Sequence, residues 1–183
     1  MSRGAGNDAA GFGWVSRFVH WTMAAAILCM LAFGTYLGRT EPSLANLWMY
    51  GLHKSVGLCL LAALMARVAW HRLSPPPPPL TEGIAPWQHG LARILHVLLY
   101  LLMAAVPLTG WIGSSATGID TVFFGRWIVP PIAPVSERLD DIFMGLHWTL
   151  TKLLVLCVIL HIAGALDRHF RKGDATLRRM WRG

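Results

Sequence analysis

Four long apolar stretches, separated by short polar or proline-rich segments, dominate the chain. They cover approximately residues 14–38, 46–70, 89–114 and 140–169. Each exceeds the roughly 20 residues that a helix needs to cross ~30 Å of hydrocarbon. The stretches lack the alternation of a membrane β-strand, and a helix satisfies its own backbone hydrogen bonds in lipid. The pattern predicts an all-α integral membrane protein, a four-helix bundle.

The composition agrees with that class of protein. Of the 183 residues, 55% are hydrophobic and 14% are charged, whereas about 25% are charged in a typical soluble domain. The first apolar stretch is too long for the core of a signal peptide, and no small-residue cleavage site follows it, so we expect it to remain as the first span. We expect one domain over residues 14–181, preceded by a short tail over residues 1–13.

Two connections between the predicted spans stand out. Five consecutive prolines at residues 75–79 cannot continue a helix and favour a stiff, extended spacer after the second span. The longest loop, residues 116–139, is too apolar to extend freely into water, so we expect it to fold over the outer end of the bundle. Its apolar residues include Phe123, Phe124, Trp127, Ile128 and Ile132.

Lysine and arginine are distributed unequally between the two ends of the spans. By the positive-inside rule, the excess predicts that both termini are cytoplasmic. The net charge of +7 is then mainly a topology signal, reinforced by attraction to anionic membrane lipid, and does not indicate a nucleic-acid partner. The predicted cytoplasmic set is Arg3, Arg17, Arg67, Arg72, Arg93, Arg168, Arg171, Lys172, Arg178, Arg179 and Arg182, against Arg39, Lys54, Arg126 and Arg138 on the opposite side.

Two histidines of the fourth stretch are spaced as ligands of two stacked sites. His147 and His161 are fourteen residues apart, which places them about 40° apart on one face of a helix and ~21 Å apart along its axis. Intramembrane ionisable groups are costly and are usually functional. His53 and His20 lie at depths that match His147 and His161, respectively. We therefore predict an outer pair, His53 with His147, and an inner pair, His20 with His161.

Paired imidazoles favour haem iron over other metals. Bis-imidazole haem needs two protein ligands, whereas a zinc site needs four, and no Cys, Asp or Glu completes such a set near these histidines. The chain has no C-x-x-C-H motif, so covalent attachment of a c-type haem is excluded. The sequence thus predicts two haem b groups with His20, His53, His147 and His161 as iron ligands.

Neighbouring positions predict space and charge around the haems. Gly34 lies fourteen residues after His20, on nearly the same face at the level of the outer site, where a glycine lets a porphyrin edge approach the backbone. Arg67 lies fourteen residues after His53 and would face the inner haem, where its guanidinium can pair with a propionate. Gly57 and Gly110 are further candidates for close approach, and helix packing by small residues explains them equally well.

Five segments carry a resemblance to a known family. They are residues 18–21 (FVHW), 52–57 (LHKSVG), 100–111 (YLLMAAVPLTGW), 123–134 (FFGRWIVPPIAP) and 147–180, which ends in ALDRHFRKGDATLRRM. Over residues 14–181 the chain resembles the bacterial cytochrome b561 family, and the four histidines fall at that family's ligand positions. In one departure, Arg168 precedes His169 where a superoxide-oxidising relative carries consecutive histidines.

The resemblance implies a function and a location. It implies a dihaem b-type cytochrome of the bacterial inner membrane that exchanges electrons with ubiquinone. Some members of the family are superoxide oxidases, so the resemblance also implies a superoxide:ubiquinone oxidoreductase. Superoxide or another one-electron donor, quinone and membrane lipid are then the expected partners.

Candidate residues for the donor and the quinone follow from that function. Lys54 adjoins a predicted ligand, and its long stem lets the ammonium group reach the surface and attract an anionic donor. Ordinary contact with lipid headgroups explains this lysine equally well. For quinone, we expect the inner-haem end, where His96, Arg168 and His169 gather with Arg93. His96 can relay protons there, or it can be an ordinary core histidine.

Two alternative functions stay open on the sequence. The first is an electron-relay or anchor cytochrome b subunit of a larger quinone-linked dehydrogenase or hydrogenase, which requires a partner protein. The second is a non-redox, histidine-bearing membrane transporter. A transporter needs a polar, discontinuous path, and the only strong helix breaker within a predicted span is Pro107.

Overall fold

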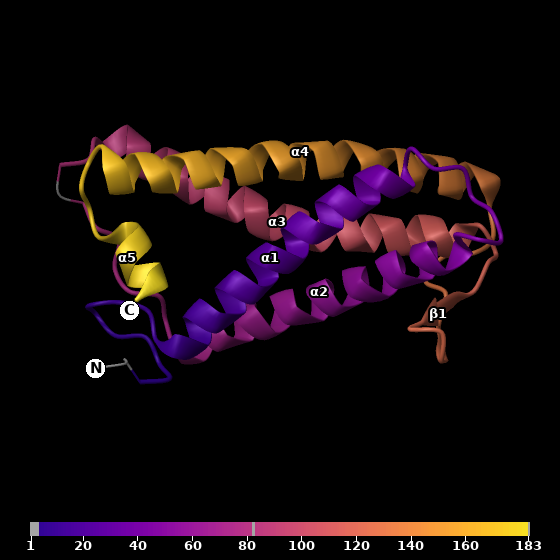
Figure 1. The fold of residues 1–183 in the computed structure, drawn as a ribbon, viewed down its shortest axis with the longest axis horizontal. Helices are drawn as coiled ribbons and strands as arrows, with labels where there is room; N and C mark the ends of the chain where they lie inside the picture. The colour runs from indigo at the N-terminus through magenta and orange to yellow at the C-terminus, as the bar shows by residue number, and fades with distance from the viewer. Residues whose placement is uncertain (1–3, 82, 183) are drawn as a thin grey trace. The chain divides into compact units, whose positions relative to one another are not determined.

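Four long helices make up most of the chain in the computed structural model, which describes residues 4–81 and 83–182 (Figure 1). All four are long and apolar enough to cross a membrane. The four predicted spans are therefore confirmed, with each boundary within three residues of its expected position. Which end faces the cytoplasm stays a prediction. The helices are α1 (Trp14–Leu37), α2 (Leu47–Leu73), α3 (Pro86–Ala116) and α4 (Glu137–Phe170).

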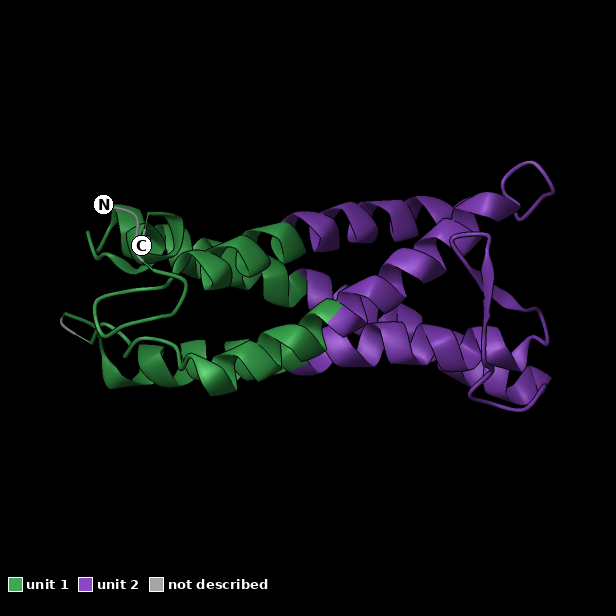
Figure 2. Ribbon diagram, turned by 90° about the horizontal axis from the view of Figure 1, so that it is seen from below, with its two compact units in different colours: residues 1–24, 63–100, 156–183 green, residues 25–62, 101–155 purple. Residues whose placement is uncertain are grey.

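The chain divides into two compact units, drawn in different colours in Figure 2. Unit 1 contains residues 1–24, 63–100 and 156–183, and unit 2 contains residues 25–62 and 101–155. Each long helix contributes one part to unit 1 and the other part to unit 2. Only 6% of the most apolar window of α1 and of α3 is buried, so these apolar side chains face outward, as they must in lipid.

A short hairpin in the longest loop interrupts the helical pattern in unit 2. Strands β1 (Thr121–Phe123) and β2 (Trp127–Val129) pair antiparallel, with Thr121 opposite Val129. The backbone amide of Phe124 donates to Ser55 Oγ of α2 at 2.9 Å, and that of Ile132 donates to Ser115 Oγ of α3 at 3.2 Å. The loop is thus held against α2 and α3, although the sequence did not predict its strands.

Unit 1 is closed by segments that lie outside the spans. The proline segment, residues 75–79, contains no helix, as predicted. A short helix follows α4, α5 (Thr176–Trp181). Its Met180 carbonyl accepts a hydrogen bond from Trp21 Nε1 at 2.9 Å. In the N-terminal segment, the Asn7 side chain donates to the Ser74 carbonyl at 2.8 Å. The segments next to α1, α2 and α4 are therefore bound to one another.

Candidate functional site

The predicted outer histidine pair lies within unit 2. His53 of α2 and His147 of α4 have ring centroids 6.4 Å apart and ring planes at 85°. The Nδ1 of His147 lies 2.8 Å from the Val106 carbonyl. A carbonyl can only accept, so Nδ1 carries the proton and donates it, and Nε2 keeps a free lone pair. This bond fixes the ring as outer partners do in known metal sites, and it leaves Nε2 available to a metal.

Two glycines leave room for the rings of this pair. A Cβ atom on Gly34 would lie 3.0 Å from Cε1 of His53, and one on Gly110 would lie 3.0 Å from Nδ1 of His147. Any larger residue would press on the imidazoles. The sequence placed Gly34 beside a porphyrin edge, whereas in the structure the neighbour of this glycine is the imidazole itself. A Cβ atom on Gly57 would meet nothing within 4 Å.

The predicted inner pair lies within unit 1. His20 of α1 and His161 of α4 have ring centroids 6.3 Å apart and ring planes at 63°. Arg67 of α2 faces this pair, as the sequence predicted, and its Nη2 lies 3.0 Å from Nδ1 of His20. A guanidinium can only donate, so Nδ1 of His20 accepts this hydrogen bond. The Nε of Arg67 is buried without a hydrogen-bond partner.

More polar side chains surround the unit 1 pair than the sequence indicated. The ring of His96 lies 5.2 Å from that of His161, and His96 is exposed at the surface. The Arg67 guanidinium lies 5.7 Å from the ring centre of Tyr100, whose hydroxyl is 3.3 Å from Nδ1 of His71. The sequence analysis singled out neither Tyr100 nor His71. Their i, i+4 spacing from His96 and Arg67 was the available signal.

Both pairs fit an iron held between two imidazoles. With metal–nitrogen bonds of ~2 Å, the centroids of two opposed imidazoles lie roughly 6 Å apart, close to the separations in both units. Within residues 4–81 and 83–182, no group of three or more His, Cys, Asp or Glu side chains is placed to hold a metal ion. The donor sets thus match bis-imidazole haem and do not match tetrahedral zinc. Ligation itself stays a prediction.

Lys54 is half-buried in unit 2 and has a carboxylate nearby. The Asp140 carboxylate, in the first turn of α4, lies within electrostatic reach of the Lys54 ammonium. Asp140 Oδ1 is buried and has no hydrogen-bond partner among the described residues. Asp140 therefore offsets part of the Lys54 charge. The side chains of the other predicted outer basic residues, Arg39, Arg126 and Arg138, are exposed.

Arg168 has a structural partner that the sequence analysis overlooked. Its Nε lies 2.5 Å from an Asp174 oxygen, and its Nη2 donates to the Leu80 carbonyl at 2.9 Å. Burial raises the pKa of Asp174, but hydrogen bonds from Thr176 and from Arg168 outweigh it and hold that pKa below its ordinary value. The His169 ring packs on Phe170 at 4.8 Å. These contacts do not bring Arg168 or His169 to His96, and a quinone site built from all three stays a prediction.

Comparisons with known proteins agree with the resemblance. A model of prokaryotic cytochrome b561 matches residues 11–183. The chain is 34% identical over 172 residues to cytochrome b561 homolog 2 of Escherichia coli (strain K12), covering 92% of this chain and 90% of that protein. It is 29% identical over 163 residues to the probable superoxide oxidase CybB of Yersinia pestis, covering 88% and 90%. Cytochrome b561 homolog 1 of Escherichia coli (strain K12) is 27% identical over 168 residues, covering 89% and 92%.

Proposed function

The chain belongs to the prokaryotic cytochrome b561 family, and from that premise we propose that it is a dihaem superoxide oxidase that delivers electrons to ubiquinone. The class of protein and its location follow from membership of this family. The protein is a multi-pass haem b protein of the bacterial inner membrane, and its family is one of electron-transfer cytochromes. Membership also removes the reason to consider a non-redox transporter.

The observation that carries the proposal is the presence of one histidine pair in each unit, each with the separation of two opposed imidazoles. When bound, haem iron supplies reversible one-electron transfer. His53 and His147 would hold one group and His20 and His161 the other, and one continuous helix, α4, carries a ligand of each. Arg67 would pair with a propionate.

Unit 2 offers the side on which a small anion is collected. Superoxide gives up one electron and leaves as dioxygen, so the protein needs to attract the anion and needs no general acid or base for that half-reaction. Lys54 and the exposed Arg39, Arg126 and Arg138 raise the local concentration of an anion. Asp140 opposes this attraction because it lies near Lys54.

Unit 1 offers the side on which protons are supplied. Reduction of one quinone to quinol takes two electrons, from two superoxide ions, and two protons. His96 is exposed beside His161 and is placed to donate a hydrogen bond to a quinone carbonyl. Tyr100 and His71 are hydrogen-bonded to each other and form a second route for protons. In unit 2, the hydrogen bond found at the ring pair among the described residues runs from His147 Nδ1 to the Val106 carbonyl, which supplies no proton.

Stopped-flow reduction of the haems by superoxide tests the proposal. Reduction should be fast, and it should slow as added salt shortens the Debye length from ~30 to ~8 Å. Lys54→Gln should slow reduction several-fold with both haems retained, because it removes a positive charge that attracts superoxide. Asp140→Asn should accelerate reduction, because it removes a negative charge that repels superoxide. A rate indifferent to salt and to both variants would reject steering, and absence of superoxide-driven reduction would reject the oxidase.

One observation favours a second candidate, the electron-relay subunit. Lys152 is exposed in the middle of α4 and has no ion-pair partner in the part of the chain that the structure describes. A charge at that depth costs about 3 kcal/mol, and a carboxylate on a helix of a partner protein would lower the cost. If superoxide fails as a donor while a stoichiometric membrane partner co-purifies and is lost on Lys152→Leu, the relay function replaces the oxidase.

A further inference from the structure

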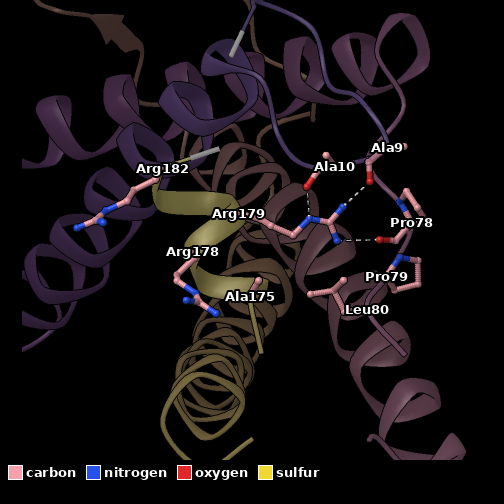
Figure 3. Close-up of a pocket in the computed structure, with 9 residues that line it drawn as sticks. All are labelled: Ala9, Ala10, Pro78, Pro79, Leu80, Ala175, Arg178, Arg179 and Arg182. Atoms are coloured by element: carbon pink, nitrogen blue, oxygen red, sulfur yellow. Dashed lines mark hydrogen bonds between the residues drawn. The ribbon is translucent and has the colours of Figure 1, made fainter. Parts of the chain in front are cut away.

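Arg178 and Arg179 of α5, together with Arg182 just after its last residue, line a groove at the end of unit 1. The groove has a volume of about 430 Å³, and Figure 3 shows the residues that line it. Arg179 donates to the carbonyls of Ala9, Ala10 and Pro78 at 2.9–3.0 Å. This arginine therefore holds the walls of the groove together. The remaining wall is apolar and includes Pro79 and Leu80.

The other two arginines of the groove lack such bonds. Arg178 and Arg182 are exposed, and no hydrogen bond or ion pair engages their guanidinium groups among the described residues. Arg178 lies in α5 and Arg182 directly follows the last residue of that helix, and their side chains extend in different directions at the edge of the groove (Figure 3). Each of these exposed guanidinium groups can bind a phosphate through paired hydrogen bonds.

The carboxylates near this end are engaged elsewhere. Asp174 is paired with Arg168, and Asp167 with Arg171 at 3.0 Å. The Asp8 carboxylate accepts hydrogen bonds from the amides of Ala10 and Gly11, each at 2.8 Å. The positive charge of Arg178 and Arg182 is thus left for a ligand from outside the chain.

The groove lies where three spans end. Ala10 precedes α1 by four residues, Leu80 follows α2 by seven, and Ala175 follows α4 by five. Large apolar side chains next to these ends are exposed, with Leu73 at 82% and Trp181 at 65%. A membrane interface suits such side chains, whereas bulk water does not. The ligand is therefore one that the membrane surface itself presents.

We propose that this groove binds the headgroup of one anionic phospholipid. Its phosphodiester is bound by the exposed guanidinium groups of Arg178 and Arg182, and the start of its acyl chains lies against Pro79 and Leu80. Basic pockets beside membrane spans bind such headgroups through the same combination of charge and apolar wall. The site is separate from the histidine pairs and does not depend on the electron donor or acceptor.

Native mass spectrometry of the haem-loaded protein in mild detergent, titrated with phosphatidylglycerol, tests this site. Wild-type protein should bind one molecule saturably and should prefer it to phosphatidylcholine with the same acyl chains. The double variant Arg178→Gln/Arg182→Gln should bind phosphatidylglycerol on the order of tenfold more weakly. The matched control Arg72→Gln/Lys172→Gln removes the same charge from exposed residues outside the groove and should bind within twofold of wild type.

Three outcomes would overturn the proposal. Equal weakening in both double variants would mean diffuse attraction to the whole charged end. Equal affinity for phosphatidylcholine would mean that the net charge of the headgroup is not recognised. Displacement of phosphatidylglycerol by millimolar inorganic phosphate, with equal affinity for both, would make the groove a free-phosphate site. An unchanged haem spectrum in both double variants shows that any difference reflects the groove and not loss of fold.

Discussion

The two histidine pairs have almost the same ring separation, 6.3 Å in unit 1 and 6.4 Å in unit 2, but their surroundings differ. In unit 2 the rings lie against glycine backbone, and His147 is fixed by the Val106 carbonyl. In unit 1 the rings lie among Arg67 and His96. A backbone carbonyl cannot change its charge or move far, whereas an arginine and a histidine can reorient or exchange protons.

The difference assigns different tasks to similar ligand sets. A ring held by the backbone, with Nδ1 already protonated, is prepared to bind metal and to transfer electrons without protons. In unit 1, Nδ1 of His20 accepts from Arg67, so a neutral His20 carries its proton on Nε2. Binding iron through Nε2 then requires Arg67 to find another acceptor, such as a propionate. Unit 1 is thus the region where binding, charge and proton supply are linked.

The largest effect should come from removing one ligand in each unit. His147→Ala should remove the unit 2 haem and His161→Ala the unit 1 haem, each lowering the haem content by about half, because one imidazole is left per iron. A pyridine haemochrome assay counts the haems, and the low-spin spectrum identifies the one that remains. Retention of two low-spin haems in both variants would defeat the pairing, and loss of both haems in each would show that the units are not independent.

The sequence predicted the four spans and the two histidine pairs better than it predicted the groups that surround the rings. Apolar stretches located all four spans, the fourteen-residue spacing on α4 indicated two sites, and matching depths within the spans indicated which histidines come together. The acceptor for His147 is the backbone carbonyl of Val106, and every residue has such a carbonyl, so the sequence could not predict this hydrogen bond. The hairpin depends on Phe124 adopting a φ of 46°, which the identity of a phenylalanine does not indicate. The ion pair of Arg168 was also missed, because its partner Asp174 lies beyond the end of α4.

A smaller effect should follow from removing the charge beside each pair. Arg67→Met should lower the midpoint potential of the unit 1 haem by tens of millivolts, because the lost cation favours the reduced state. Lys54→Met should shift the unit 2 haem less, because Arg67 Nη2 lies 3.0 Å from a ring of its pair, whereas among the described residues the Lys54 ammonium is hydrogen-bonded to neither ring of the unit 2 pair. Optical redox titrations in the His147→Ala and His161→Ala backgrounds assign each shift to one haem. If Arg67→Met and Lys54→Met shifted the midpoint potentials equally, the two histidine pairs would not differ in their electrostatic surroundings.

The smallest effect should appear at the two ends, which are closed by different chemistry. Backbone amides of Phe124 and Ile132 donate neutral hydrogen bonds to the Ser55 and Ser115 hydroxyls and hold the hairpin loop of unit 2. In unit 1, the Arg168–Asp174 ion pair holds the segment before α5. Because the folded pKa of Asp174 lies below its ordinary value of 3.8, the ion pair contributes fully above that value and is lost as the pH falls through the folded pKa. The loss should be about 1 kcal/mol.

Hydrogen exchange, corrected for the intrinsic effect of pH, should therefore show protection of residues 174–182 falling several-fold between pH 6 and pH 3, while residues 121–129 keep theirs. Asp174→Asn should start with the lower protection and lose the pH dependence, since an amide cannot titrate. If the hairpin loosened in acid to the same extent as α5, the transition would belong to the whole chain and not to this ion pair. If neither end responded, the ion pair would contribute nothing measurable and the ends would be equivalent.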